Sequence, residues 1–345
     1  MASGAILIRK GYNIGKINTI KMETRNIFVS HEVLKEHFIK YFHQSLVKYY
    51  SKYLIKVFGE TAEMPIHLAY LCPLCLENYI VLRNDNPELS RVTSDFNLDH
   101  FPPESVGGKN KVLVCEPCNR DAGSAFDFIL KEKLKQETFH RKIPNSKLEL
   151  RAAIEGLKGN FKGHININTD ANTEFSYNPN KKNEYLNNWN KTQESQKASI
   201  TLLIKKFTED ENLKVTKAFL KSAYLYGFYL WGYDFVFSTN GGLIRKVLAD
   251  ELKYPLDLPT FWIDDIAHIP EGICFIEEPI QISTHIVNIP IISKELNYKA
   301  IASVILPAPE ENGWEQLLNF ATFLKDWEKL DIKLKKVPNL FNTTI

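Results

Sequence analysis

The sequence lacks the long apolar runs and the one-sided charge of a membrane protein or a uniformly basic nucleic-acid coat. Its most apolar long stretch, residues 222–237, contains Asp234 and is shorter than the about 20 residues that a helix needs to cross a bilayer. The apolar run at residues 5–8 is too short for the core of a signal peptide. Lysine and arginine total 43 against 41 aspartates and glutamates, so only a local basic face is open to a polyanion. We therefore expect a cytoplasmic protein with no membrane partner.

The rest of the composition is ordinary for a globular protein. Hydrophobic residues make up 44% of the chain and charged residues 24%, and 21 phenylalanines and 15 tyrosines are enough for a sizeable core. A length of 345 residues allows two or three domains, or one domain with large additions. No internal repeat or low-complexity tract is evident, so the fold has to be inferred from local patterns.

Cysteine is scarce, but four of the five cysteines form two C-x-x-C pairs. Cys72 and Cys75 stand in LCPLC, Cys115 and Cys118 stand in VCEPC, and Cys274 is alone, as expected of a buried small hydrophobe. Without an export signal, such pairs more often bind zinc than form disulfides. Two pairs can complete one tetrahedral four-thiolate site. The sequence therefore predicts a structural zinc site, with a redox dithiol as the alternative.

The residues around the second cysteine pair follow the order strand, loop, strand, knuckle and helix. NLDHF alternates polar and apolar residues, PPESVGG has loop composition, and NKVLVC has the β-branched character of a second strand. The residues from 120 to 137 have the apolar spacing of a helix. Asp99 and His100 are therefore expected at the end of the first strand, and Asn119 at the start of the helix.

This segment resembles the HNH endonuclease family in its zinc-knuckle branch, over roughly residues 68–135. The family pattern runs C-x-x-C, then D-H-x-x-P with a loop ending in Gly-Gly, then an asparagine before a second C-x-x-C-N. The matching residues of the later part are Asp99, His100, Pro103, Gly107, Gly108, Asn110, Cys115, Cys118 and Asn119. The resemblance implies a ββα-metal unit that grips one divalent ion and cleaves phosphodiester bonds. It also implies that Asn110 orients the catalytic imidazole. Where the family often has Lys-Gly after the final asparagine, this chain has Ala122-Gly123, so a basic phosphate contact is missing there.

The same residues suit this chemistry on physical grounds. His100 can take a proton from water near neutral pH. Asp99 and Asn119 offer oxygen ligands that favour Mg²⁺ or Mn²⁺, with Ni²⁺ or Zn²⁺ as competitors. Asn110 is placed to hydrogen-bond the loop carbonyl beside His100, and Arg120 to contact a phosphate. Each has a plainer alternative: Asn110 as a turn residue, Asn119 as a helix N-cap and Arg120 as a solvated charge.

Outside this segment the sequence predicts elements but no known functional family. The expected helices cover residues 31–58, 181–207, 213–231, 243–252 and 312–330, and the expected strands cover a hairpin at 160–179, a strand at 235–239 before an NGG turn, and three antiparallel strands within 272–307. The fold class is therefore α+β. We expect an N-terminal helical region at 1–64, a nuclease domain at 65–138 and a C-terminal α+β region at 139–345.

Three functions remain open at this point. The favoured one is a metal-dependent endonuclease that acts on double-stranded DNA, with structural zinc and a catalytic divalent ion. Its C-terminal region would recognise the target or regulate cleavage, and a regulatory protein or a second copy of the chain would be a further partner. A role in restriction or antiphage defence follows only by analogy. The alternatives are a non-catalytic zinc-knuckle protein that binds nucleic acid, and a nuclease or toxin that cleaves RNA.

Overall fold

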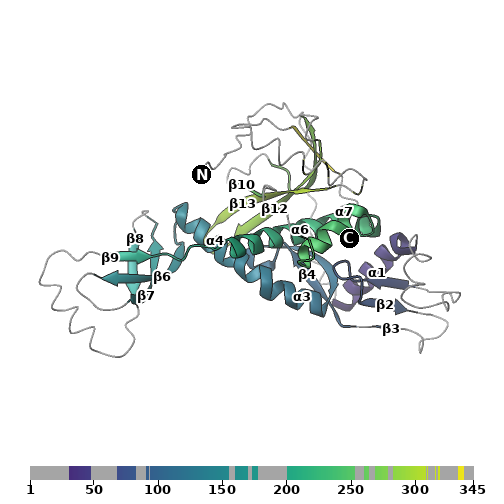
Figure 1. The fold of residues 1–345 in the computed structure, drawn as a ribbon, viewed down its shortest axis with the longest axis horizontal. Coiled ribbons are helices and arrows are strands. Elements are labelled where there is room, and N and C mark those ends of the chain that lie inside the picture. Colours follow the sequence, from purple (N-terminus) through teal and green to yellow (C-terminus); the bar gives the residue numbers. More distant parts are fainter. Residues whose placement is uncertain are drawn as a thin grey trace, which may run out of the picture.

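The computed structural model describes residues 31–47, 68–82, 91–92, 94–154, 160–169, 173–177, 200–252, 260–263, 269–278, 283–307 and 333–337, with residues 309, 315 and 318. Within these residues the chain mixes helices with small antiparallel sheets, as the α+β prediction expects (Figure 1). None of the described helices has the length and apolar character that crossing a membrane requires. Of the expected N-terminal helical region at 1–64, residues 1–30 and 48–64 lie outside the described residues.

The N-terminal described part carries both cysteine pairs. Strands β1 (Leu68–Leu71), β2 (Tyr79–Leu82) and β3 (Arg91–Val92) form one antiparallel sheet, and β4 (Phe96–Phe101) pairs with β5 (Asn110–Cys115) in another. Helix α1 (His31–Val47) packs against β1. The two predicted strands around the Asp-His pair are confirmed, and their register sets His100 opposite Lys111.

A continuous helical segment follows β5. It consists of α3 (Glu116–Ala122), a π-helical turn η5 (Gly123–Asp127) and α4 (Phe128–His140). The prediction of a helix is confirmed, but the helix begins before Asn119. Cys115 is the extended residue before the first turn, and that turn contains Pro117, whose fixed φ suits this position. Asn119 therefore lies inside the helix and is not its N-cap.

A four-stranded sheet, called the small sheet because it is smaller than the C-terminal one, lies at one end of the elongated molecule, beyond α4 (Figure 1). Its strands are β6 (Lys147–Ile154), β7 (Asn160–Ile167), β8 (Thr173–Tyr177) and β9 (Ile200–Leu203), in the order β8-β7-β6-β9. The predicted hairpin is confirmed as β7 and β8, which pair antiparallel. Leu148, Leu150 and Ile165 form a core of their own for this sheet.

The C-terminal part is built on one long helix and one sheet. Helix α6 (Glu209–Val236) begins with a capping box between Thr208 and Glu211 and has a kink at Gly232, where φ is 59°. Helix α7 (Thr239–Leu248) follows it, capped by the Ser238 side chain. The sheet has the order β10-β13-β12-β11-β14. Its strands are β10 (Thr260–Ile263), β11 (Gly272–Glu278), β12 (His285–Ser293), β13 (Tyr298–Leu306) and β14 (Lys333–Lys336).

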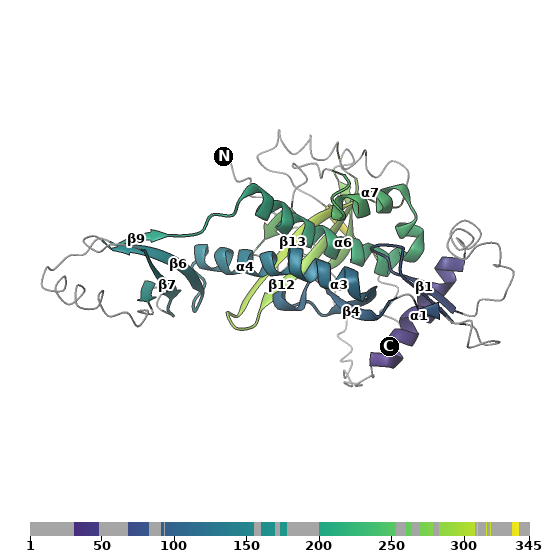
Figure 2. The ribbon, with the colours of Figure 1, turned by 60° about the horizontal axis from the view of Figure 1, so that its bottom comes forward.

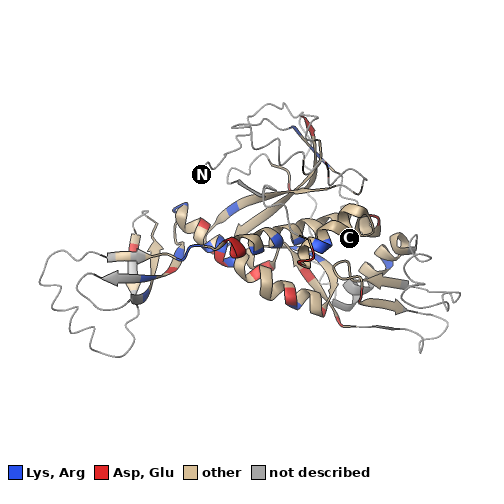
Figure 3. Ribbon diagram, in the orientation of Figure 1, with Lys and Arg blue, Asp and Glu red and all other residues tan. Residues whose placement is uncertain are grey.

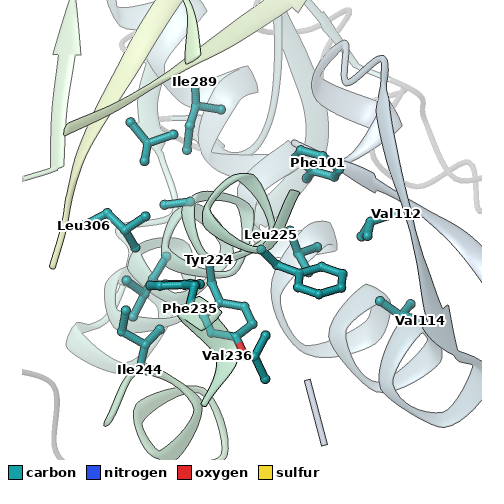
Figure 4. Packing of buried hydrophobic residues seen from close by; sticks show 14 of the residues in the cluster. Phe101, Val112, Val114, Tyr224, Leu225, Phe235, Val236, Ile244, Ile289 and Leu306 are labelled. Carbon is teal, nitrogen blue, oxygen red and sulfur yellow. The ribbon is translucent and has the colours of Figure 1, made fainter. Parts of the chain in front are cut away.

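Helix α6 joins the two halves through one hydrophobic core. It lies between the β4–β5 hairpin and the sheet strands β12 and β13 (Figure 2). In Figure 4, Phe101 and Val112 approach α6 from one side and Ile289 and Leu306 from the other. The strand that carries the Asp-His pair therefore shares its core with the C-terminal sheet.

Two element predictions are wrong. The segment predicted as a strand at 235–239 and an NGG turn is helical, because α6 runs to Val236 and the Ser238 cap starts α7 at Thr239. The residues from 200 to 203, predicted as the apolar end of a helix, form β9, where Ile200 pairs with Ile154 of β6. Residues 48–58 of the first predicted helix and residues 181–199 of the second lie outside the described residues. So does the predicted helix over 312–330, apart from Glu315 and Leu318, which are helical.

Candidate metal centre and the Asp99–His100 strand

Four cysteines from neighbouring elements converge on one point. Cys72 follows β1, Cys75 lies in the turn before β2, Cys115 ends β5 and Cys118 lies in α3, and their sulfur atoms all lie within 4.8 Å of one another. Zinc–sulfur bonds of about 2.3 Å in a tetrahedron require sulfurs about 3.8 Å apart. The Sγ atoms of Cys75 and Cys115 are 3.8 Å apart. This cluster could hold a metal ion such as zinc, as the two C-x-x-C pairs predict.

The first cysteine pair lies on a tight turn that also directs donors at the sulfurs. The Cys72 N–H donates to the Asn78 carbonyl at 2.8 Å, and Leu76 adopts a left-handed φ of 60° inside the turn. The Asn78 side-chain amide then donates to Cys115 Sγ at 3.3 Å, and the Cys115 N–H approaches Cys72 Sγ at 3.5 Å. Such donors stabilise thiolates, the form of cysteine that binds metal.

The thiols of the cluster do not hold their protons equally. Hydrogen bonds with the neighbouring cysteine thiols, Cys115 first, lower the pKa of Cys75 far below its usual value. Hydrogen bonding with Cys118 lowers the pKa of Cys115 to about 7. Burial raises the pKa of the Cys72 thiol. A lowered pKa favours the thiolate form that a metal requires, and a bound metal would deprotonate the remaining thiols.

Tyrosines of α6 tie the first cysteine pair to the C-terminal half. The Tyr224 hydroxyl donates to the carbonyl of Pro73, inside the C-x-x-C turn, at 2.8 Å. The Leu71 N–H donates to the Tyr233 hydroxyl at 2.7 Å, and that hydroxyl in turn donates to the Leu71 carbonyl. All three hydrogen bonds are buried, and a buried polar group that loses its partner destabilises the fold. The position of the metal centre is therefore fixed by α6 as well as by its own turn.

His100 and Asp99 lie on opposite faces of β4. His100 is half-buried, and burial together with the positive charge of Lys111 across the ladder lowers the pKa of His100 below its ordinary 6.5. Its imidazole is therefore mainly neutral at pH 7, the state in which it can accept a proton. Asp99 is only 4% exposed and points into the protein, as alternation along a strand requires.

The interior partner of Asp99 is Lys221 of α6. The Lys221 ammonium is 3% exposed and lies 2.8 Å from Asp99 Oδ2 and 3.8 Å from the carboxylate of Asp127, the last residue of the π turn. The contact between Lys221 and Asp99 is an ion pair without hydrogen-bond geometry. Asp99 Oδ2 and Lys221 Nζ, and also Asp127 Oδ1, therefore lack hydrogen-bond partners within the described part of the chain. Burial raises the pKa of Asp127 to about 6, against the lowering effect of Lys221.

Among the described residues, three or more histidine, cysteine or acidic ligand atoms converge closely enough for a metal at the four cysteines, and Asp99 and Asp127 form no such group. One buried carboxylate, Asp99, and one half-buried carboxylate, Asp127, face one ammonium, and Asp127 Oδ1 is a buried oxygen without a donor among the described residues. An ion at Asp99 would share that carboxylate with Lys221. Carboxylates that ligate metals are commonly held by such outer partners.

The other predicted site residues have partners of different kinds. The Asn110 side-chain amide donates to the Tyr226 hydroxyl of α6 at 2.8 Å. Asn119 is half-buried in α3, and no hydrogen bond among the described residues joins it to Asp99. Arg120 is exposed and pairs with Asp121 at 3.5 Å. The structure thus brings the four cysteines together, and it places Asp99 and His100 on opposite faces of β4.

Lys221 is the residue that sequence reasoning missed, whereas Asp127 is a possible additional ligand in the sequence, with an ordinary helix carboxylate as the favoured interpretation. Lys221 stands at the head of the apolar run SAYLYGFYLWGY, and a charge at the edge of a buried helix is a signal that it has a buried partner. Asp127 looks like an ordinary helix carboxylate, and only the π turn carries it toward Lys221. The partner of each lies far away in the sequence, so spacing alone could not pair them.

Comparison of the chain with protein-family models, with curated proteins and with solved structures returns no match. The resemblance to the HNH family therefore rests on the residues named above.

Proposed function

We propose that this protein is an endonuclease that hydrolyses phosphodiester bonds in DNA. The observation that carries the proposal is the placement of a neutral, half-buried His100 at the end of a β-hairpin whose second strand leads into the four-cysteine centre and a helix. This is the order of elements expected of a ββα-metal unit. Zinc at the four cysteines would be structural, since all four ligand positions come from the protein.

In the proposed mechanism His100 is the general base. Its imidazole accepts a proton from the attacking water, and Lys111, opposite it in the ladder, favours the neutral form of the ring. Asp99 and Asn119 would hold the divalent ion, Mg²⁺ or Mn²⁺. When bound, that ion supplies Lewis-acid stabilisation of the charge that develops on the phosphate. Lys221 fixes Asp99 from the interior, and Arg120 is exposed and available to a phosphate.

The test is cleavage of supercoiled plasmid with Mg²⁺, with Mn²⁺ and with no added divalent ion. We expect His100→Ala to slow cleavage by about two to four orders of magnitude, the usual share of general-base catalysis. His140→Ala is the matched control, because His140 is exposed at the end of α4. The wild-type rate should rise with pH as His100 loses its proton, with a midpoint below 6.5 because the pKa of His100 is lowered. Equal rates for the two variants would refute the mechanism.

The buried Asp99–Lys221 pair favours a second candidate, a non-catalytic zinc protein that binds nucleic acid. An ammonium already neutralises the carboxylate in this pair, so Asp99 has a role in folding that needs no catalytic ion. Intact zinc content with no cleavage of plasmid, single-stranded DNA or RNA would favour this function. Cleavage confined to RNA would instead identify a ribonuclease, because no base-reading motif separates the two substrates.

A further inference from the structure

A large groove lies beside the His100 hairpin. It has a volume of about 1570 Å³ and is lined by α4, by strands β6 and β7, by the segment after β9, by the turn between β12 and β13, and by the loop that follows β4. Figure 2 shows β12 and β13 running beside α4, with β6 and β7 beyond its end. The groove therefore joins the small sheet, which has no role in the metal centre, to the hairpin that carries His100.

The lining of the groove is strongly positive relative to the rest of the chain. Eight lysines and arginines line it against four glutamates, an excess of four, whereas the whole chain has an excess of only two. Lys135 is paired with Glu132 and Lys205 with Glu211. The other six form no ion pair with any described residue: Lys109, Lys131, Lys147, Arg151, Lys162 and Lys294. Figure 3 shows lysine and arginine positions along α4 and on the small sheet.

The groove reaches the loop that follows the strand of His100, although His100 itself does not line it. The loop after β4 turns at Gly107, where φ is +88°, and a Cβ added there would lie 2.7 Å from Ile292 of β12. The loop backbone thus packs directly on the strand that leads into the β12–β13 turn. One end of the groove is therefore held in place by the loop that immediately follows the strand of His100.

From these observations we propose that the groove binds the phosphate backbone of double-stranded DNA and leads it to His100; the choice of DNA rests on the proposed function. The unpaired cations lie on α4, on the sheet and on the turn, so they can neutralise phosphates on more than one side of a bound duplex. A groove for single strands would need several aromatic platforms for stacked bases. Phe128, 59% exposed, is the large exposed aromatic among the described lining residues.

The test measures binding by fluorescence anisotropy in the His100→Ala protein, so that cleavage does not interfere, over a series of salt concentrations. The groove variant combines Lys131→Gln, Lys162→Gln and Lys294→Gln. The matched control combines Lys246→Gln, Lys299→Gln and Lys335→Gln, three exposed lysines of α7, β13 and β14 that do not line the groove. We expect the groove variant to bind duplex DNA at least about tenfold more weakly than the control. Its slope of log affinity against log salt should fall by about three, one for each lost phosphate contact.

The outcomes separate the groove from the nuclease. Equal duplex affinity of the two triple variants, with zinc content and melting temperature unchanged, would overturn the groove proposal. So would tighter binding of single-stranded DNA or of double-stranded RNA than of duplex DNA. Groove-dependent duplex binding by a His100-intact protein that cuts no DNA would refute the proposed function and leave the groove assignment standing. Normal cleavage by the three groove substitutions placed in the protein with His100 intact would refute the groove alone.

Discussion

Lys221 places a positive charge in the interior of the protein, directly behind the strand of Asp99 and His100. Its ammonium has two carboxylate partners, Asp99 at 2.8 Å and Asp127 at 3.8 Å, and all three groups come from different elements. Moving an ion from water into a protein interior costs several kcal/mol. The carboxylates of Asp99 and Asp127 therefore need the Lys221 ammonium to balance their charge. Lys221 therefore holds β4, the π turn and α6 together as one polar contact inside an apolar core.

We predict that Lys221→Met destabilises the protein by about 3–5 kcal/mol, because it leaves the buried Asp99 carboxylate and the half-buried Asp127 carboxylate without a counter-ion. Lys214→Met is the control on the same helix: Lys214 pairs with Asp210 at 2.7 Å on the surface, where solvent screens the pair and its loss costs little. Urea unfolding followed by circular dichroism measures both. Adding Asp99→Asn to Lys221→Met should restore part of the loss. Similar stability losses for the two lysine variants would contradict this account of the buried cluster.

At the scale of elements, the loop between β4 and β5 decides how the His100 hairpin meets the C-terminal sheet. Gly107 turns the chain with a left-handed φ of +88° and leaves no room for a side chain against Ile292. A Cβ added at Gly108 would come closer still, 1.6 Å from the Pro102 carbonyl oxygen on the other side of the turn. The Gly-Gly pair thus lets η4 (Glu104–Val106) and its loop pack onto β12.

Gly107→Ala should therefore destabilise the protein by about 2 kcal/mol or more, from the left-handed φ and from the clash with Ile292. Gly123→Ala is the matched control. Gly123 has a helical φ, and a Cβ there would meet nothing within 4 Å, so this change should be neutral or stabilise by up to about 1 kcal/mol. Thermal and urea unfolding give both values. A Gly107→Ala protein as stable as Gly123→Ala would mean that the loop is not held against β12.

The sequence predicts those elements whose signals are local. The β7–β8 hairpin has clear alternation, whereas β5 and the strands at 272–307 are short apolar runs rich in β-branched residues. The convergence of Cys72 with Cys115 follows from two C-x-x-C turns. The prediction of a strand at 235–239 is wrong because a short apolar run such as FVF is also typical of the buried end of a helix. Tertiary packing decides between the two structures. Contacts between distant segments, such as Asn110 with Tyr226, leave no trace in local spacing.

At the scale of the whole molecule, the cysteine centre and the C-terminal sheet are parts of one core. Residues of α1, β1, β4, β5, α6, α7 and the five-stranded sheet belong to a single buried cluster. The buried hydroxyls of Tyr224 and Tyr233 reach from α6 to the residues around Cys72. The buried cluster therefore contains residues on both sides of residue 138, whereas the small sheet has its own core.

This shared core makes a prediction about metal removal. If zinc bound at the cysteines stabilises only its own module, a chelator should unfold residues 68–140 and leave α6 and β13 protected. We expect instead that loss of zinc exposes the amides of β1, β5, α6 and β13 together, because zinc binding energy is folding energy and the core is common to all four. Hydrogen exchange with and without chelator, followed by mass spectrometry, measures this. Cys72→Ser should reproduce the chelator's effect, and Cys274→Ser, a buried cysteine outside the cluster, should not. Protection of α6 and β13 that survives zinc removal would show that the two parts fold independently.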